Sequence, residues 1–348
     1  MNDRLISEPA PRRLVSIVVP VYYNADTLSE LLHRFRTIAD ALPHLGFEFL
    51  CVDDGSGDDS MAILTRESVA DRRVRAIRLA RNFGSNAAIL AGLTHARGDC
   101  AVVIAADLQD PPELIPQLVR AWEDGSEVVL AARRTRHDPP LATLAATIFN
   151  RLFRRLVFPT FPRDGFDFML VSARVAGILA TMAEKNSYIF GQVMWVGFQP
   201  SIVYYDRLPR QFGSSRWSFT RRVKYFIDAF TAFSYWPIRV ASLAGFIFAL
   251  VGVLYALVII ALRLLNVIQE PGFAAIMVVL LLTSGVQLVV TGMIGEYLWR
   301  VLEEVRGRPV FIVAHTVNMD EGQMPIDVED GALASVGLQR VTGGSTQY

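Results

Sequence analysis

Apolar and polar positions follow two periods in the first part of the chain. Five short runs rich in Val, Ile and Leu predict buried strands, at 14–21, 47–53, 74–80, 100–107 and 127–134. Between them, four longer amphipathic stretches predict helices, at 26–42, 59–70, 85–97 and 113–125. Strands that alternate with helices in this way are typical of a mostly parallel sheet covered on both faces, so we expect an α/β fold. Ligands of such sheets bind beyond the carboxyl ends of the strands.

After residue 134 the pattern changes. Two apolar runs without a charged residue, 240–262 and 271–295, each exceed the ~20 residues that a helix needs to cross a bilayer core. Two such runs side by side predict two transmembrane helices rather than core helices of a soluble protein. Two other segments, 141–159 and 216–236, combine basic with aromatic residues, as helices in the membrane interface do. We favour the interface for 216–236, which adjoins the first apolar run; for 141–159, an amphipathic helix packed on the preceding domain is an equal alternative.

Composition and charge are those of a membrane protein. The chain has 348 residues, 52% of them hydrophobic, and its mean hydropathy of +0.33 is high for a soluble protein. Basic residues flank the two apolar runs on their outer sides: Arg216, Arg221, Arg222, Lys224 and Arg239 precede the first run, and Arg300, Arg306 and Arg308 follow the second. The connection 266–272 contains neither Lys nor Arg. By the positive-inside rule both flanks and both termini are predicted to be cytoplasmic, which suits reduced thiols at Cys51 and Cys100.

Acidic and amide side chains follow the predicted strands. Asp53 and Asp54 end the second strand in "VDDGS", and Asp107 and Gln109 follow the fourth in "AADLQDPP". An Asp pair in this position can accept hydrogen bonds from the base or ribose of a nucleotide, with capping of the next helix as the alternative. Together with Tyr22 in "VPVYYN", at the end of the first strand, the set favours a nucleotide site. The oxygens of Asp107 and Gln109 suit Mg²⁺ or Mn²⁺, which bind through one or two protein oxygens and substrate phosphates.

Several other kinds of site lack their motifs. "DGSGDDS" lacks the third glycine of a dinucleotide fingerprint, and the chain contains no P-loop, paired CxxC or HExxH motif. The histidines are scattered along the chain, which argues against a zinc site. The strand-end acids are therefore the main candidates for chemistry.

Six motifs together point to one family. "VSIVVPVYYN", "VDDGSGD", "RNFGSNAAILAGL", "ADLQDPPELIP", "FDFMLVS" and "RQFGSSRWSF" occur in the order found in glycosyltransferase family 2. The chain most closely resembles its polyprenyl-phosphate glycosyltransferases, the group that contains dolichol-phosphate mannose synthase and bacterial undecaprenyl-phosphate sugar transferases. The resemblance covers roughly residues 14–313. It implies a glycosyltransferase A-type, Rossmann-like fold.

The resemblance also implies a reaction. A sugar would move from a UDP- or GDP-linked nucleotide sugar to a polyprenyl phosphate, with inversion, for modification of cell-envelope glycan or lipopolysaccharide. The sequence looks bacterial, which favours undecaprenyl phosphate as the acceptor. Membrane lipid is implied as a partner and nucleic acid is not, while self-association into a homo-oligomer is left open.

The implied organisation places the protein in the inner (plasma) membrane. We expect a cytoplasmic catalytic domain over 1–215, an interfacial helix over 216–236, two transmembrane helices within 237–300 and a cytoplasmic tail over 301–348. The tail is polar and acidic after Ala314, so disorder is predicted there.

The resemblance assigns roles to residues at matching positions. Nucleotide-sugar binding maps onto Pro20, Tyr22, Asn24, Asp53, Asp54 and Asp107, metal binding onto Asp107 and Gln109, and acceptor-phosphate binding onto Arg133, Arg136, Ser215 and Arg216. Catalysis maps onto Asp107 and onto Asp167 in "FDFML", which would be the base or the carboxylate that orients the acceptor. The alternatives are Asp164 as the base, a helix-capping role for Asp167, and a solvated basic surface at Arg136.

Two positions depart from the family pattern. Ala105 replaces the first Asp of the metal-binding Asp-x-Asp, and Ala25 and Asp26 follow Asn24 where the family has Asn-Glu. The missing carboxylate weakens the metal prediction without removing it, because Asp107, Gln109 and a diphosphate can complete a site.

Two other functions compete with this prediction. A processive polysaccharide synthase shares the fold but needs a QxxRW motif and more spans, whereas "QFGSSRW" places four residues between Gln211 and Arg216. The second is a membrane-anchored nucleotide-sugar binder that lost its activity with Ala105, against which the remaining acidic and basic site residues argue. The identity of the sugar is not determined by the sequence.

Overall fold

The computed structural model describes residues 12–134, 147, 150–163, 165–182, 184, 188–206, 233–234, 236–265 and 272–319. Within these residues an 8-stranded sheet lies at the centre, in the order β7-β5-β6-β4-β1-β2-β3-β8. The strands are β1 (Leu14–Val21), β2 (Gly46–Asp53), β3 (Val74–Leu79), β4 (Cys100–Val103), β5 (Val128–Arg133), β6 (Phe166–Ser172), β7 (Ser201–Tyr205) and β8 (Val313–Val317). The helices are α1 (Ala25–Ala41), α2 (Ser60–Ala70), α3 (Ser85–His95), the 3₁₀ helix η1 (Pro112–Leu114), α4 (Ile115–Glu123), α6 (Ala173–Thr181), α7 (Ile189–Trp195), α9 (Trp236–Leu264) and α10 (Phe273–Val305).

Most strands of the sheet are parallel. β1 pairs parallel with β2 and β4, β3 with β2, and β7 with β5, whereas β6 lies antiparallel between β4 and β5. β8 pairs antiparallel with β3. The strands and helices predicted from the periodicity are present as β1–β5 and α1–α4, so the mostly parallel α/β fold is confirmed. The pattern did not predict β6, β7 and β8, because they stand outside the regular alternation of strands and helices.

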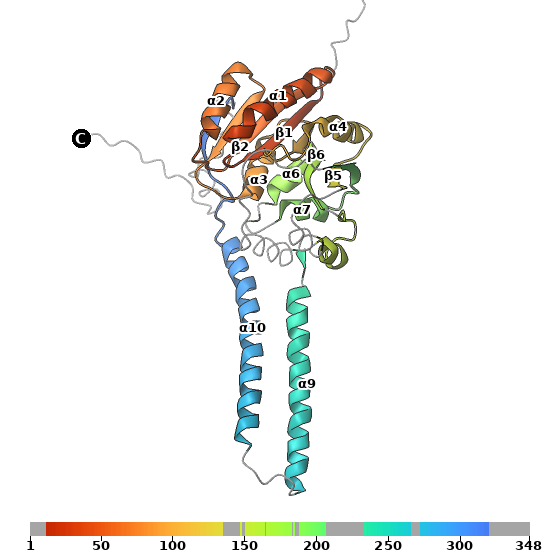
Figure 1. Cartoon of the computed structure of the whole chain (residues 1–348), viewed down its shortest axis with the longest axis vertical. Coiled ribbons are helices and arrows are strands. Elements are labelled where there is room, and N and C mark those ends of the chain that lie inside the picture. Colours follow the sequence, from red (N-terminus) through yellow and green to blue (C-terminus); the bar gives the residue numbers. More distant parts are fainter. Residues whose placement is uncertain are drawn as a thin grey trace, which may run out of the picture.

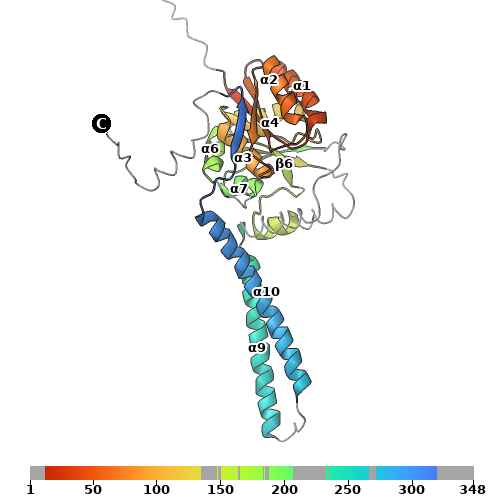
Figure 2. The same cartoon turned by 90° about the vertical axis from the view of Figure 1, so that its left-hand side faces the viewer.

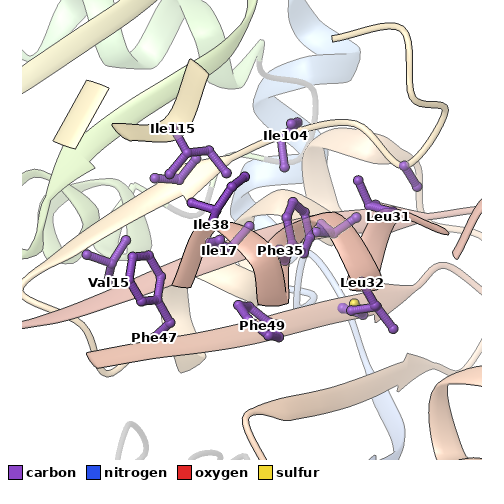
Figure 3. Packing of buried hydrophobic residues seen from close by; sticks show 14 of the residues in the cluster. Val15, Ile17, Leu31, Leu32, Phe35, Ile38, Phe47, Phe49, Ile104 and Ile115 are labelled. Atoms are coloured by element: carbon purple, nitrogen blue, oxygen red, sulfur yellow. The ribbon is translucent and has the colours of Figure 1, made fainter. Parts of the chain in front are cut away.

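Two hydrophobic clusters hold the sheet between its helical layers. Side chains of β1 alternate between them: Val15 and Ile17 belong to the cluster with α1, and Val18 belongs to the opposite cluster with α3. Phe35 of α1 and Phe49 of β2 are fully buried, with ring centroids 5.5 Å apart (Figure 3). Full burial of each such side chain contributes about 1.5–3 kcal/mol. This dense packing holds the strand ends, and the loops that follow them, in fixed positions.

Two long helices project away from the domain. They run side by side in both views (Figure 1 and Figure 2). Large apolar side chains are exposed on both, among them Phe246 of α9 and Leu288 of α10. Among the described residues one helix, α9, is long and apolar enough to cross a membrane, over Ile238–Tyr255 with a mean hydropathy of 2.0. The second predicted span coincides with most of α10 and is not confirmed by this criterion.

After α10 the chain returns to the sheet. Val313 opens β8 opposite Leu79, the last residue of β3. Asn318, just after β8, donates side-chain hydrogen bonds to two backbone carbonyl groups of the domain. The prediction of disorder after Ala314 is therefore wrong for residues 315–319, because backbone pairing at a sheet edge holds a segment whose composition is polar. Residues from 320 onwards lie outside the described residues.

Candidate active site

The carboxyl ends of β1, β2 and β4 lie next to one another at one end of the sheet. Hydrogen bonds join the loops that follow these strands. Tyr23 N donates to Ser56 Oγ at 3.0 Å, which joins the loops after β1 and β2. Thr27 Oγ1 donates to Ala106 O at 2.7 Å, which joins the first turn of α1 to the loop after β4. The predicted nucleotide and metal residues therefore lie on loops that are tied to one another.

The loop after β1 contains two of the residues predicted to bind the nucleotide sugar. Tyr22 N donates to Asn24 Oδ1 at 2.9 Å, and the rings of Tyr22 and Tyr23 meet edge to face with centroids 4.7 Å apart. Pro20, the third predicted residue of this region, lies inside β1 opposite Val52. Tyr22 and Asn24 are thus beyond the strand end, and Pro20 is not.

Asp53 organises the turn after β2. Its side chain is fully buried, and its Oδ1 accepts a hydrogen bond from Ser56 N at 3.1 Å. Its Oδ2 lies 3.6 Å from Arg78 Nε and has no hydrogen-bond partner among the described residues. Arg78 also donates to Ser56 O at 3.0 Å, so the guanidinium holds the same turn. Asp53 Oδ2 is itself buried, and its nearest charged partner is Arg78.

Asp54 does not cap the next helix, α2; its carboxylate holds the loop before α3 instead. Its two carboxylate oxygens accept hydrogen bonds from Phe83 N at 2.7 Å and Gly84 N at 2.9 Å, immediately before α3. Burial raises the pKa of Asp54 to about 6, although these two backbone N–H groups oppose the shift. Gly55 has φ +70°, and a Cβ there would lie 2.8 Å from the carbonyl carbon of Arg81. The turn 53–57 and the loop 81–84 therefore pack closely, with Asp54 as their link.

Asp107 and Gln109 lie in the loop after β4. Gln109 N donates to Asp107 Oδ1 at 3.2 Å, and Leu108 between them has a φ of 58°, which non-glycine residues seldom adopt. Ala105 lies in the same loop. In the part of the chain that the structure describes, no three His, Cys, Asp or Glu side chains are grouped so that they could hold a metal ion. One carboxylate and one amide oxygen fit Mg²⁺ or Mn²⁺ if substrate phosphates supply further ligands.

Asp167 and Arg133 contact each other at the same side of the sheet. The guanidinium of Arg133, at the end of β5, donates to Asp167 Oδ2 at the start of β6. Arg133 is buried, whereas 48% of the Asp167 side chain is exposed. Burial alone would lower the pKa of Arg133, but attraction to Asp167 and Asp110 raises it above its usual range. The predicted base and one predicted phosphate ligand thus form an ion pair.

Four residues considered for the site lie outside the described residues. They are Asp164, Arg136, Ser215 and Arg216. Their roles stay predictions from the resemblance.

Comparison with known proteins identifies the family. Residues 16–179 match the model of glycosyl transferase family 2. The undecaprenyl-phosphate 4-deoxy-4-formamido-L-arabinose transferase of Pseudomonas syringae pv. syringae is 35% identical over 89% of this chain and 93% of its own length. The SfII prophage-derived bactoprenol glucosyl transferase of Shigella flexneri is 33% identical over 86% of this chain and 97% of its own length. This chain belongs to glycosyltransferase family 2.

A solved structure is also similar to this glycosyltransferase. Glucosyl-3-phosphoglycerate synthase from Mycobacterium tuberculosis, in complex with Mn²⁺, uridine diphosphate and phosphoglyceric acid, aligns with a TM-score of 0.43 at 18% identity. The alignment covers 58% of this chain and 72% of that chain.

Membership of the family confirms the resemblance and the enzyme class, while the residue roles remain predictions. Two further buried residues, which were not among the predicted site residues, lie near Arg133. Asp110 was visible in "LQDPP", but its burial was not, and Tyr205 lies outside every motif quoted above. Tyr205 OH donates to Asp110 Oδ1, directly behind Arg133.

Proposed function

We propose that this glycosyltransferase moves a sugar from a UDP- or GDP-linked nucleotide sugar to a polyprenyl phosphate, with inversion. Undecaprenyl phosphate is the proposed acceptor, because two relatives that align over most of both chains carry undecaprenyl phosphate or bactoprenol in their names. Those names include glucose and a formamido-arabinose, so the sugar is left open. The product would serve modification of cell-envelope glycan or lipopolysaccharide.

One observation carries this proposal. Both connections to the long helices leave the sheet at the carboxyl ends of its parallel strands, on the same side as Asp53 and Asp107. β7 ends at Tyr205, paired with Arg133 at the end of β5, and the chain then continues towards α9. From α10 the chain enters β8 at Val313, opposite Leu79 at the end of β3. A polyprenyl tail is held in hydrocarbon by ~0.8 kcal/mol per buried CH₂, so its phosphate stays at the membrane surface. A sheet attached on this side brings the donor site to that phosphate.

Packing near the start of α9 supports the same arrangement. Phe233, just before α9, lies against Phe158 with ring centroids 5.7 Å apart. It also covers Gly191 of α7, where a Cβ would lie 2.5 Å from the Phe233 ring. The helical residues 150–156 precede Phe158 and carry exposed Arg151 and Arg155, which suit anionic lipid headgroups. Phe153 of the same segment is fully buried in the domain core, so the described residues of 141–159 fit the alternative of a helix packed on the domain.

The site residues divide into a donor side and an acceptor side. Asp53 would bind the nucleoside, and Asp107 and Gln109 would hold Mg²⁺ or Mn²⁺ together with the donor diphosphate. That cation would neutralise the leaving diphosphate. Arg133, with Arg136, Ser215 and Arg216, would bind the acceptor phosphate, since a guanidinium contacts phosphate oxygens in two places.

Asp167 would orient this acceptor or act as its base. A strong base is less necessary here than in transfer to a hydroxyl group, because the second pKa of a phosphomonoester is about 6. Substitutions of Asp107 and of Asp167 should therefore have different effects. Loss of Asp107 should impair activation of the donor, and loss of Asp167 should impair placement of the acceptor.

The proposed topology has α9 and α10 crossing the inner membrane as a hairpin, with the domain over 1–215 and the tail over 301–348 in the cytoplasm. Antiparallel pairing of β8 with β3 supports it, because residues 313–317 must then lie on the same side as the sheet. Single engineered cysteines at 269 and 330 test this arrangement with an impermeant reagent applied to intact cells. We expect labelling at 269 only, and labelling at 330 without 269 would overturn the topology.

The test of the reaction uses membranes that contain the full chain or its Asp107→Asn variant. They are incubated with undecaprenyl phosphate and a panel of labelled nucleotide sugars, and the lipid product is identified. We expect one sugar to be transferred by the wild type and little by the variant. Nucleotide-sugar binding without any lipid product would indicate an inactive binder and refute the proposal.

A further inference from the structure

A buried polar cluster lies behind Asp167. Its members are Asp110, Arg133 and Tyr205, which are 0%, 7% and 5% exposed. They come from the loop after β4, the end of β5 and the end of β7, and Arg133 and Tyr205 are direct partners in the β5–β7 pairing. Burial of a charge is costly unless it is paired and hydrogen-bonded. The cost of burying these groups therefore suggests that the cluster contributes either to folding or to the site next to it.

The contacts of the cluster lead from the interior to the site. Tyr205 OH donates to Asp110 Oδ1, and Arg133 donates to Asp167 Oδ2. Arg133 and Tyr205 are adjacent across the β5–β7 pairing, and the charge of Asp110 attracts the Arg133 guanidinium and raises its pKa. Burial and then the charge of Asp110 raise the pKa of Tyr205 above its usual range, which keeps the phenol protonated as a donor. Arg133 thus lies between a fully buried carboxylate and one that is half exposed.

We propose that Asp110 and Tyr205 are positioning residues that hold the Arg133 guanidinium in one orientation, so that Asp167 and the acceptor phosphate meet donors already in place. This inference rests on the proposed function, because it gives both residues a role on the acceptor side of that reaction. An arginine side chain has many rotamers, and attraction to a buried carboxylate that Tyr205 itself holds in place restricts them before the substrate arrives. Supporting contacts of this kind decide how accurately a site residue is held.

The first test is Tyr205→Phe in the full-length enzyme, which removes one hydroxyl group and little volume. We expect kcat for lipid glycosylation to fall about 10- to 100-fold, as for loss of a hydrogen bond to a charged group. The KM for undecaprenyl phosphate should rise, whereas nucleotide affinity should change by less than about twofold, because Asp53, the residue proposed to bind the nucleoside, lies after β2 and not on the loop that contains Asp110. Tyr204→Phe is the matched control, since this neighbouring tyrosine is 53% exposed, and it should leave both substrates unaffected.

A double-mutant cycle separates positioning from general stability. If Tyr205 acts through Arg133, adding Tyr205→Phe to Arg133→Lys should lower kcat by less than about twofold further. If the two residues act independently, the two losses in kcat should multiply. Asp110→Asn keeps the shape of the side chain and removes its charge. It too should raise the KM for undecaprenyl phosphate and leave nucleotide affinity nearly unchanged.

Three outcomes would overturn the inference. Wild-type kcat and acceptor KM in Tyr205→Phe would show that the hydroxyl group has no such role. Loss of nucleotide affinity in parallel with turnover, or multiplicative effects with Arg133→Lys, would show that the cluster only stabilises the fold. A wild-type enzyme that glycosylates no lipid phosphate would instead refute the proposed function, and this inference with it.

Discussion

Removal of the Asn318 side chain tests whether the segment that returns from α10 completes the folded domain. Asn318 Nδ2 donates to Ser68 O at 2.8 Å and to Val74 O at 2.9 Å. These carbonyl groups lie at α2 and at the start of β3, so the two bonds fix the segment to the domain. The φ of Asn318 is 56°, in the left-handed region that Asn tolerates better than Ala does.

The expected cost follows from these contacts. Loss of the two hydrogen bonds costs about 1–3 kcal/mol, and the left-handed backbone costs alanine about 1 kcal/mol more. We therefore expect Asn318→Ala to lower the free energy of unfolding of the domain by about 2–4 kcal/mol, which corresponds to a fall in Tm of about 5–15 °C for a domain of this size. Asn318→Gly is the matched variant: it loses the same bonds but adopts the positive φ more easily, so its loss should be smaller by up to about 1 kcal/mol.

The assay is thermal unfolding of the purified full-length protein in detergent, followed by tryptophan fluorescence at one protein and detergent concentration. Sugar transfer after a heating step provides a second readout. A Tm for Asn318→Ala within about 2 °C of the wild type would refute the reasoning, because it would correspond to less than about 1 kcal/mol. The returning segment would then not be held by these bonds.

Three further perturbations test the site. Asp107→Asn should remove most turnover, because an amide does not neutralise the cation that holds the donor diphosphate, whereas Ala105→Asp should retain activity. Full activity of Asp107→Asn, or of the wild type in chelator, would contradict the metal assignment. Stability should fall as the pH rises from about 4 to about 6, because the raised pKa of Asp54 makes the native state bind more protons than the unfolded state in that range. In denaturant titrations this fall should be about 3 kcal/mol smaller in Asp54→Asn, and an unchanged pH dependence would contradict the assignment. Arg216→Ala should raise the Michaelis constant for lipid acceptor far more than that for nucleotide sugar, and equal effects, measured with each substrate varied separately, would place Arg216 at the donor site.

Local patterns in the sequence were sufficient for much of the fold. The strands β1–β5 are short apolar runs buried on both faces, and helices such as α1 bury an apolar face at the helical period, so a short window of sequence contains the information. The place of Asp53 at the end of β2 followed from those boundaries, whereas Asp107, predicted to end the fourth strand, lies in the loop after β4. The family followed from motifs whose order along the chain is itself a sequence property.

Only the tertiary structure decided how the polar groups are partnered. Asp53 and Asp54 are neighbours in one motif, yet Asp54 binds the loop before α3 through both oxygens, whereas Asp53 keeps one oxygen without a hydrogen-bond partner among the described residues. Tyr205 reaches Asp110 across a sequence separation of 95 residues. β8 joins the sheet only after the chain has passed through two long helices. Such contacts depend on which strands become neighbours, and strand order arises from packing of the whole domain rather than from the residues adjacent in sequence.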